Sequence, residues 1–143
     1  MTKHSVAAVW LAAVFAGGCG GELRPVDLFP EDMCGVCRMA VSDPRFASEI
    51  IEDDGTVHKF DDLGCLQKFR AKAGGMKIAA IFVKDFETRA WVAYEKSTIV
   101  ETGIATPMAS GRVAFAGTDR ARTFAAEHPP QQAAAGCCSG MED

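Results

Sequence analysis

Two cysteines and two methionines lie close together in the stretch MCGVCRM, residues 33–39. Cys37 and Met39 are two positions apart, so in an extended strand their side chains project to the same face. A thiolate and a thioether together form a soft donor pair, which selects Cu(I) over harder divalent ions. The spacing therefore predicts a soft-metal site at Cys37 and Met39, beside Cys34.

A further methionine, Met108, lies in the stretch ATPMASG, residues 105–111. It follows a proline in a polar loop bounded by glycine, where a thioether is presented more readily than buried. Histidine offers no alternative metal site near the cysteines, because His4, His58 and His128 are far apart along the chain. Met108 is the candidate soft ligand from the second half of the sequence.

The Cys34–Cys37 pair also allows two other interpretations. A thioredoxin-type dithiol needs a helix directly after the pair to activate its first thiol, but the sequence RMAVSDPRF after Cys34-Gly-Val-Cys37 favours extended structure. A structural zinc site needs four ligands, usually from two pairs. Cys65 stands alone on a predicted helix, where a buried apolar role is expected.

The C-terminal stretch GCCSGMED holds a second set of soft donors, Cys137, Cys138 and Met141. We expect residues 129–143 to form a disordered tail, in which these residues are either a secondary metal site or inert. Five cysteines follow Cys19, an odd number that cannot close completely into disulfides. At least one thiol is then free, buried or metal-bound.

The first residues have the pattern of a secretory signal: Lys3 and His4 precede an apolar run of 12 residues that ends at GGC. The run is too short to span a bilayer. The sequence FAGGC resembles a bacterial lipobox, which predicts a signal peptide over 1–18 and Cys19 as a lipidated N-terminus carrying acyl chains such as palmitate. The mature protein would then lie outside the cytoplasm, anchored to a membrane.

After a predicted tether over 19–32, the pattern indicates an α+β domain over 33–128. The stretch 48–60 predicts a hairpin around Asp54-Gly55, 63–73 an amphipathic helix capped by Asp61 or Asp62, and 77–86 a buried strand. The second half repeats the plan, with strands at 89–101 and 111–117 and a helix capped by Thr118 or Asp119. We expect two small ββαβ-like units in tandem, over about 33–86 and 87–128.

Composition excludes several functional classes. The chain is 48% hydrophobic and 24% charged, with a net charge of −4 and no basic stripe, so a nucleic-acid partner is not expected. No phosphate-binding loop, nucleotide fingerprint or Ser/His/Asp order is present, and the adjacent Asp61 and Asp62 have a structural role as caps. The sequence does not predict an enzyme.

Taken in order, the lipoprotein-like leader, the CxxCxM stretch, FDDLGC at a helix start and TPMASGRVAFA resemble the NosL family. The resemblance spans Cys34 to about Phe124. It implies a lipid-anchored periplasmic Cu(I) chaperone, attached to the outer rather than the inner membrane, that serves nitrous oxide reductase in denitrification. Its partners would be that reductase and its copper-loading membrane transporter. It also implies a fold related to part of the organomercurial lyases.

Carried over to this sequence, the resemblance implies Cu(I) ligands at Cys37, Met39 and Met108, with Cys34 able to complete the site. Arg38 stands where the family commonly has glycine before its methionine. Two alternatives from other classes stay open. The first is an organomercurial-lyase-like enzyme, which needs a carboxylic acid beside the thiols. The second is a periplasmic thiol–disulfide protein using Cys34 and Cys37.

Overall fold

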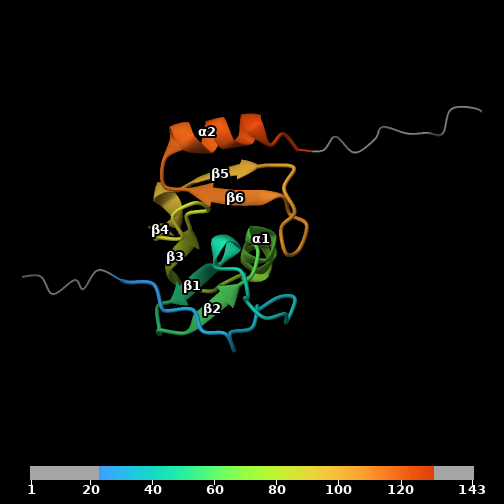
Figure 1. Ribbon diagram of the computed structural model, residues 1–143. Coiled ribbons are helices and arrows are strands. Elements are labelled where there is room, and N and C mark those ends of the chain that lie inside the picture. Colours follow the sequence, from blue (N-terminus) through green and yellow to red (C-terminus); the bar gives the residue numbers. More distant parts are fainter. Residues whose placement is uncertain (1–22, 131–143) are drawn as a thin grey trace, which may run out of the picture.

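The computed structural model describes residues 23–130. The predicted signal peptide, the lipidation site Cys19 and the tail residues Cys137, Cys138 and Met141 lie outside these residues. The fold is α+β, as expected: two antiparallel sheets and two α-helices (Figure 1). Neither helix of the described region is long and apolar enough to cross a bilayer.

The first sheet has four antiparallel strands in the order β2-β1-β3-β4. They are β1 (Ser48–Glu52), β2 (Val57–Phe60), β3 (Ile78–Lys84) and β4 (Trp91–Ala93), and α1 (Leu63–Lys72) connects β2 to β3. The predicted hairpin is confirmed, because Gly55 takes the positive φ of 87° that the turn requires and Asp54 Oδ1 accepts a hydrogen bond from Thr56 N. The strand β3 is buried only toward its end, at Phe82 and Val83.

The second sheet pairs β5 (Thr98–Glu101) with β6 (Arg112–Phe115), and α2 (Thr118–Glu127) packs against both strands. The stretch predicted as one strand or strand pair at 89–101 divides between the sheets. β4 belongs to the first sheet, although it lies beyond residue 86, the predicted end of the first unit. A 3₁₀ turn, η2 (Tyr94–Lys96), then leads to β5. The predicted side-chain cap of α2 is wrong, since Gly117 is the N-cap residue and no side chain caps the helix.

The two halves make the same aromatic contact. Phe60 and Phe69 place their ring centroids 5.1 Å apart, and Phe115 and Phe124 place theirs 5.2 Å apart. In each half the second strand of a hairpin thus packs against the helix that follows it. The first half continues into β3, whereas no strand follows α2 as far as residue 130.

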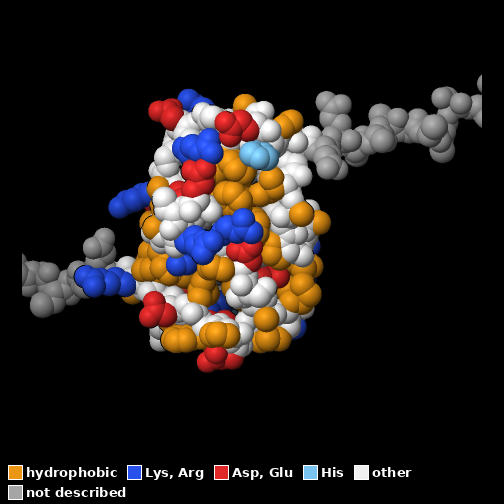
Figure 2. Space-filling model, in the orientation of Figure 1, with side chains coloured by type: hydrophobic (Ala, Val, Ile, Leu, Met, Phe, Trp, Pro, Cys, Tyr) orange, Lys and Arg blue, Asp and Glu red, His pale blue; other side chains and the backbone are white. Residues whose placement is uncertain are grey.

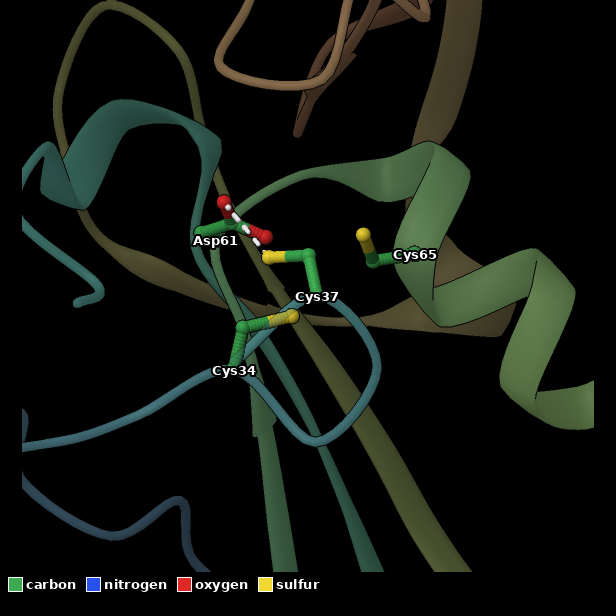
Figure 3. Close-up of side chains that lie close together, drawn as sticks. All are labelled: Cys34, Cys37, Asp61 and Cys65. Atoms are coloured by element: carbon green, nitrogen blue, oxygen red, sulfur yellow. Dashed lines mark hydrogen bonds between the residues drawn. The ribbon is translucent and has the colours of Figure 1, made fainter. Parts of the chain in front are cut away.

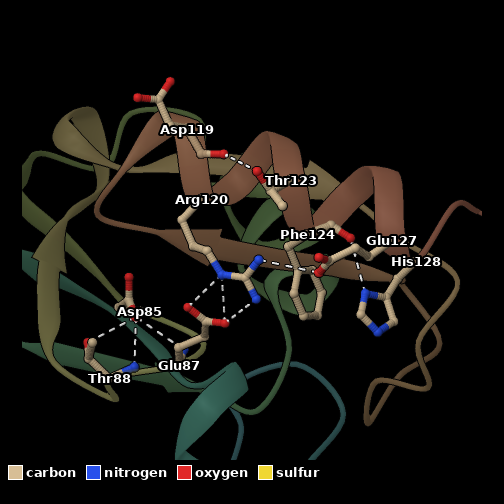
Figure 4. A network of polar contacts seen from close by, with 9 residues as sticks. All are labelled: Asp85, Glu87, Thr88, Asp119, Arg120, Thr123, Phe124, Glu127 and His128. Atoms are coloured by element: carbon tan, nitrogen blue, oxygen red, sulfur yellow. Dashed lines mark hydrogen bonds and ion pairs between the residues drawn. The ribbon is translucent and has the colours of Figure 1, made fainter.

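One buried carboxylate, Asp85, joins the two sheets at the end of β3. Its Oδ1 accepts from Glu87 N, Thr88 N and Thr88 Oγ1 at 2.8–3.1 Å (Figure 4). Its Oδ2 accepts from Ala116 N at 2.7 Å. Phe86 N also donates to Ala114 O, beside a parallel bridge between Asp85 and Ala114. This side chain is therefore one of the links that fix the relative placement of the two halves.

The C-terminal part of the predicted tether contacts the folded domain. Val26 N donates to Glu49 Oε1, and Lys59 Nζ donates to Asp27 O and Asp32 Oδ2 at 2.6 Å. These contacts hold residues 26–32 along β1 and β2, immediately before Cys34. A short 3₁₀ turn, η1 (Pro44–Phe46), then leads from the cysteine loop into β1.

Candidate metal centre

The loop that carries the two cysteines is a tight hairpin-like turn rather than an extended strand. Cys34 N donates to Met39 O at 2.8 Å, Arg38 N donates to Cys34 O at 3.1 Å, and Met33 pairs with Ala40. Arg38 has a φ of 64°, a left-handed conformation that reverses the chain between Cys37 and Met39. The extended geometry predicted for this segment is therefore wrong.

Four potential ligand side chains converge beneath this turn: Cys34, Cys37, Asp61 and Cys65 (Figure 3). The ligand atoms lie within 4.8 Å of one another. Cys34 and Cys37 come from the turn, Asp61 directly follows β2, and Cys65 lies one turn into α1. We call these four residues the thiol cluster.

The local sequence explains why Asp61 and Cys65 meet. Asp62 is the N-cap of α1 and accepts from Gly64 N at 2.6 Å, so it points toward the helix. Its neighbour Asp61 points the other way, into the core, and accepts from Cys37 Sγ at 3.4 Å. Cys65 is buried beside Leu63 and Leu66, as its apolar surroundings predict.

Burial controls the protonation of the cluster. It raises the pKa of the Cys37 thiol, and hydrogen bonds with Cys34 and Asp61 act in the same direction. It also raises the pKa of Cys65, reinforced by Cys34 and by the nearby carboxylate of Asp61. Both thiols are thus protonated at neutral pH when no metal is bound. The Oδ1 atom of Asp61 is buried and finds no hydrogen-bond partner among the described residues.

This arrangement has the dimensions of a metal site. Metal–sulfur bonds of about 2.3 Å place two donors on one ion at most about 4.6 Å apart, close to the observed limit of 4.8 Å. Three thiols are a soft set that favours Cu(I). A buried carboxylate oxygen without a partner also calls for an explanation, and a bound cation nearby would supply one.

The two predicted methionine ligands occupy different places. Met39 is 49% exposed and its thioether is at the surface of the turn. Met108 is partly buried and packs against the core that contains Cys34, Cys65 and Leu66. Its backbone N donates to Asp62 Oδ2 at 3.0 Å, so the N-cap of α1 also holds the β5–β6 loop against the helix.

Burial raises the pKa of Asp62, but hydrogen bonds from Ser110, Thr106, Met108 and Gly64 outweigh it and leave the pKa below its usual range. Asp62 is thus a charged, fully buried link between the loop and α1.

Gly64 permits the close approach of that loop, and replacing it with alanine should loosen the site. A Cβ on Gly64 would lie 2.8 Å from Ser110 Cβ and 2.9 Å from Asp62 Oδ1. We expect Gly64→Ala to lower the free energy of unfolding by about 1–3 kcal/mol, the usual cost of overpacking, in urea denaturation. Gly74→Ala is the matched control, because a Cβ there meets nothing within 4 Å. Equal stability of the two variants would contradict this role.

Sequence reasoning placed Cys34 and Cys37 in the site but missed Asp61 and Cys65. The sequence signal that could have revealed Asp61 is the pair Asp61-Asp62. A helix needs only one N-cap residue, so the second carboxylate is left for another role. With Asp61 and Cys65 added to Cys34 and Cys37, four potential ligands converge. This is the number of ligands that a structural zinc site needs, so Zn²⁺ stays an alternative to Cu(I). Asp61 is also the acid beside the thiols that the organomercurial-lyase alternative requires.

Comparisons with known proteins agree with the resemblance found in the sequence. The NosL family model matches residues 25–134. Among solved structures, the crystal structure of the copper chaperone NosL from Shewanella denitrificans superposes with a TM-score of 0.65 at 13% identity. The match covers 76% of this chain and 90% of that one. No curated protein sequence matches the chain. The family match confirms the expectation that the chain is not an enzyme.

Proposed function

Because the chain belongs to the NosL family, we propose that it is a Cu(I) chaperone whose thiol cluster carries the ion for maturation of nitrous oxide reductase. The observation that carries this proposal is the convergence of three thiols and a carboxylate under the Cys34–Cys37 turn. The solved structure of a copper chaperone with the same fold supports it.

In the proposed mechanism, Cu(I) reaches the half-exposed thioether of Met39 first and then passes to the thiols. Cys37 is the most accessible thiol of the cluster, while Cys34 and Cys65 are buried. When Cys37 binds the ion it releases its proton to solvent and gives up the hydrogen bond that its thiol donates to Asp61 Oδ2 in the metal-free protein. Met108, on the loop held by Asp62, is the proposed further soft ligand.

The proposed handover is ligand exchange, in which a thiol or thioether of the receiving protein displaces the ligands one at a time. Lipidation at Cys19 would keep the protein in the periplasm at a membrane, the outer rather than the inner one. It would receive copper there from a membrane transporter. These partners and this location rest on the family resemblance and on the leader sequence.

The affinity for Cu(I) should rise with pH. The metal binds thiolates, but the raised pKa of Cys37 and of Cys65 keeps both thiols protonated near neutrality. Binding must release these protons, so affinity should increase about tenfold per pH unit for each proton displaced. Competition with a chelator of known pH dependence, between about pH 6 and about pH 8, checks this. A pH-independent affinity would contradict binding through Cys37 and Cys65.

The carboxylate in the cluster favours one second candidate, Zn²⁺, which accepts Cys and Asp ligands in tetrahedral sites. Anaerobic titration of residues 20–143 with Cu(I), and separately with Zn²⁺, against chromophoric chelators decides between them. We expect one tightly bound Cu(I) per chain and much weaker binding of Zn²⁺. Tighter binding of Zn²⁺ would favour the zinc site, and no tight binding of either ion would return the Cys34–Cys37 pair to thiol–disulfide chemistry.

A further inference from the structure

A hollow of ≈ 390 Å³ lies beside the turn that carries Cys34 and Cys37. Gly35 and Val36, the two residues between these cysteines, line it together with side chains of α1. Cys37 is the most accessible thiol of the thiol cluster, since the other two are buried. A molecule in this hollow, which we call the turn hollow, would therefore contact the loop that presents the accessible thiol.

The lining of the turn hollow is partly apolar. Val36, Phe69 and Met76 pack against the core that contains Cys34 and Cys65. Each of the three is only half-buried and lines the hollow. The volume lies within the range of about 300–1,000 Å³ that is typical of ligand pockets. Because burial of apolar surface stabilises a complex, the hollow fits an apolar anchor side chain of a partner, such as leucine.

The rim of the turn hollow is basic. Lys68 and Lys72 line the hollow, are exposed, and are four residues apart, so they share one face of α1. Neither lysine forms an ion pair with any residue between 23 and 130. Other basic side chains do have a carboxylate partner within the fold: Arg45, Lys59, Arg112 and Arg120. The charges of Lys68 and Lys72 are thus left to act on a partner.

The carboxylates near α1 do not balance these charges. The helix sequence LGCLQKFRAK contains no Asp or Glu, and Asp61 and Asp62 before it are buried. Glu52 on β1 already pairs with His58. The cysteine turn adds the exposed, positively charged Arg38. Because the whole chain has a net charge of −4, the basic groups here are a local departure that favours an acidic partner.

We propose that the turn hollow is the docking site for an acidic segment of the protein that exchanges Cu(I) with this chain. An apolar side chain of that segment enters the hollow, and carboxylates beside it pair with Lys68 and Lys72. Opposite charges speed the encounter and orient the partner, which is then held next to Cys37. Docking stands on the hollow and its charges, while the partner's role in copper exchange rests on the proposed function.

Amide NMR spectra of the metal-free, reduced protein test the docking. Residues 20–143 are titrated at low salt with the synthetic peptide acetyl-Glu-Glu-Leu-Glu-Glu-amide. We expect the signals of Val36, Phe69 and Lys72 to shift, with half-saturation at about 1 mM peptide, and the signal of Thr123 on α2 to stay in place. The same peptide with Gln in place of Glu should cause much smaller shifts. Equal shifts with both peptides, or shifts caused by phosphatidylglycerol vesicles and not by the acidic peptide, would overturn the proposal.

Charge reversal locates the docking site. Lys68→Glu, Lys72→Glu should abolish the shifts that the acidic peptide causes. Lys96→Glu, Arg122→Glu is the matched control, because it changes the net charge by the same amount on exposed residues of η2 and α2. The control should bind the peptide as the unaltered chain does. Equal weakening of binding in both double variants would overturn docking at the turn hollow.

Rates of copper transfer test the role of docking in exchange. The Cu(I)-loaded chain is mixed with copper-free nitrous oxide reductase at low salt. Lys68→Glu, Lys72→Glu should transfer copper about tenfold more slowly than the unaltered chain, while its affinity for Cu(I), measured by chelator competition, stays the same. Equal transfer rates would overturn the role of the hollow in exchange. Transfer to a chelator but never to the reductase would overturn the proposed function and leave the peptide result standing.

Discussion

Cys37→Ser should lower the affinity for Cu(I) by about 100-fold or more. Loss of a residue that only orients a metal ligand commonly lowers the affinity about 10–100-fold, and Cys37 is itself a proposed ligand. Cys37 is the partly exposed member of the thiol cluster, and serine has nearly the same shape. The fold should therefore persist while a soft ligand is replaced by a hard hydroxyl. Competition with a chromophoric chelator under anaerobic conditions measures the change.

Met39→Leu is the matched control for this variant. Leucine keeps the size of the half-exposed side chain and removes only the thioether. In our account Met39 meets the incoming ion but is not among the clustered donors, so its loss should slow the uptake of Cu(I) and change the affinity only a few-fold. A large loss of affinity in Met39→Leu and none in Cys37→Ser would contradict this assignment of ligands.

Asp85→Ala should lower the free energy of unfolding by about 3 kcal/mol or more. Four hydrogen bonds end on this buried carboxylate, and one of them, from Ala116 N, ties β6 to the end of β3. Hydrogen bonds to charged groups contribute about 1.5–3 kcal/mol each, and their loss leaves buried donors without partners. Urea denaturation followed by circular dichroism measures the effect.

Glu87→Ala is the control in the same network. Its side chain forms an exposed ion pair with Arg120 at 2.6 Å, beside Asp85 (Figure 4), and exposed pairs are worth about 0–1 kcal/mol. If the two variants were equally stable, Asp85 would not be a stabilising link between the sheets. The surface in Figure 2 shows several such acidic and basic groups side by side around apolar side chains.

The Asp85 contribution should also depend on pH. Burial raises the pKa of this carboxyl, but the hydrogen bonds from Thr88, Ala116 and Glu87 outweigh it and leave the pKa below the usual 3.8. A lowered pKa means that the stabilisation is complete above about pH 4. It is lost as the pH falls through the folded-state value, so the wild-type protein and Asp85→Ala should converge in stability in acid.

Local patterns predicted most of the fold. The Asp54-Gly55 turn and the Asp62 cap follow from short-range chemistry, and each is present. The sequence did not reveal that the stretch 89–101 divides between two sheets. That division depends on long-range strand pairing, because β4 pairs with β3 whereas β5 pairs with β6.

The site was predictable in part. Cys34 and Cys37 are neighbours in sequence, so their proximity needed no tertiary information. Cys65 joins them only because α1 packs across the cysteine turn, which no spacing in the sequence reveals. The extended conformation predicted around Arg38 was wrong because a left-handed conformation is not expected for a residue with a side chain. It costs such a residue about 1–2 kcal/mol, and nothing in the sequence pattern indicates the φ of 64° that Arg38 adopts. The glycine common in the family at this position would adopt it without strain.

X-ray absorption spectroscopy of the Cu(I)-loaded protein tests the central claim most directly. We predict a copper shell dominated by sulfur at about 2.3 Å, and loss of one sulfur from that shell in Cys65→Ser, because Cys65 belongs to the thiol cluster. A shell made of nitrogen and oxygen, or a sulfur count that Cys65→Ser leaves unchanged, would contradict a copper site built on these three cysteines.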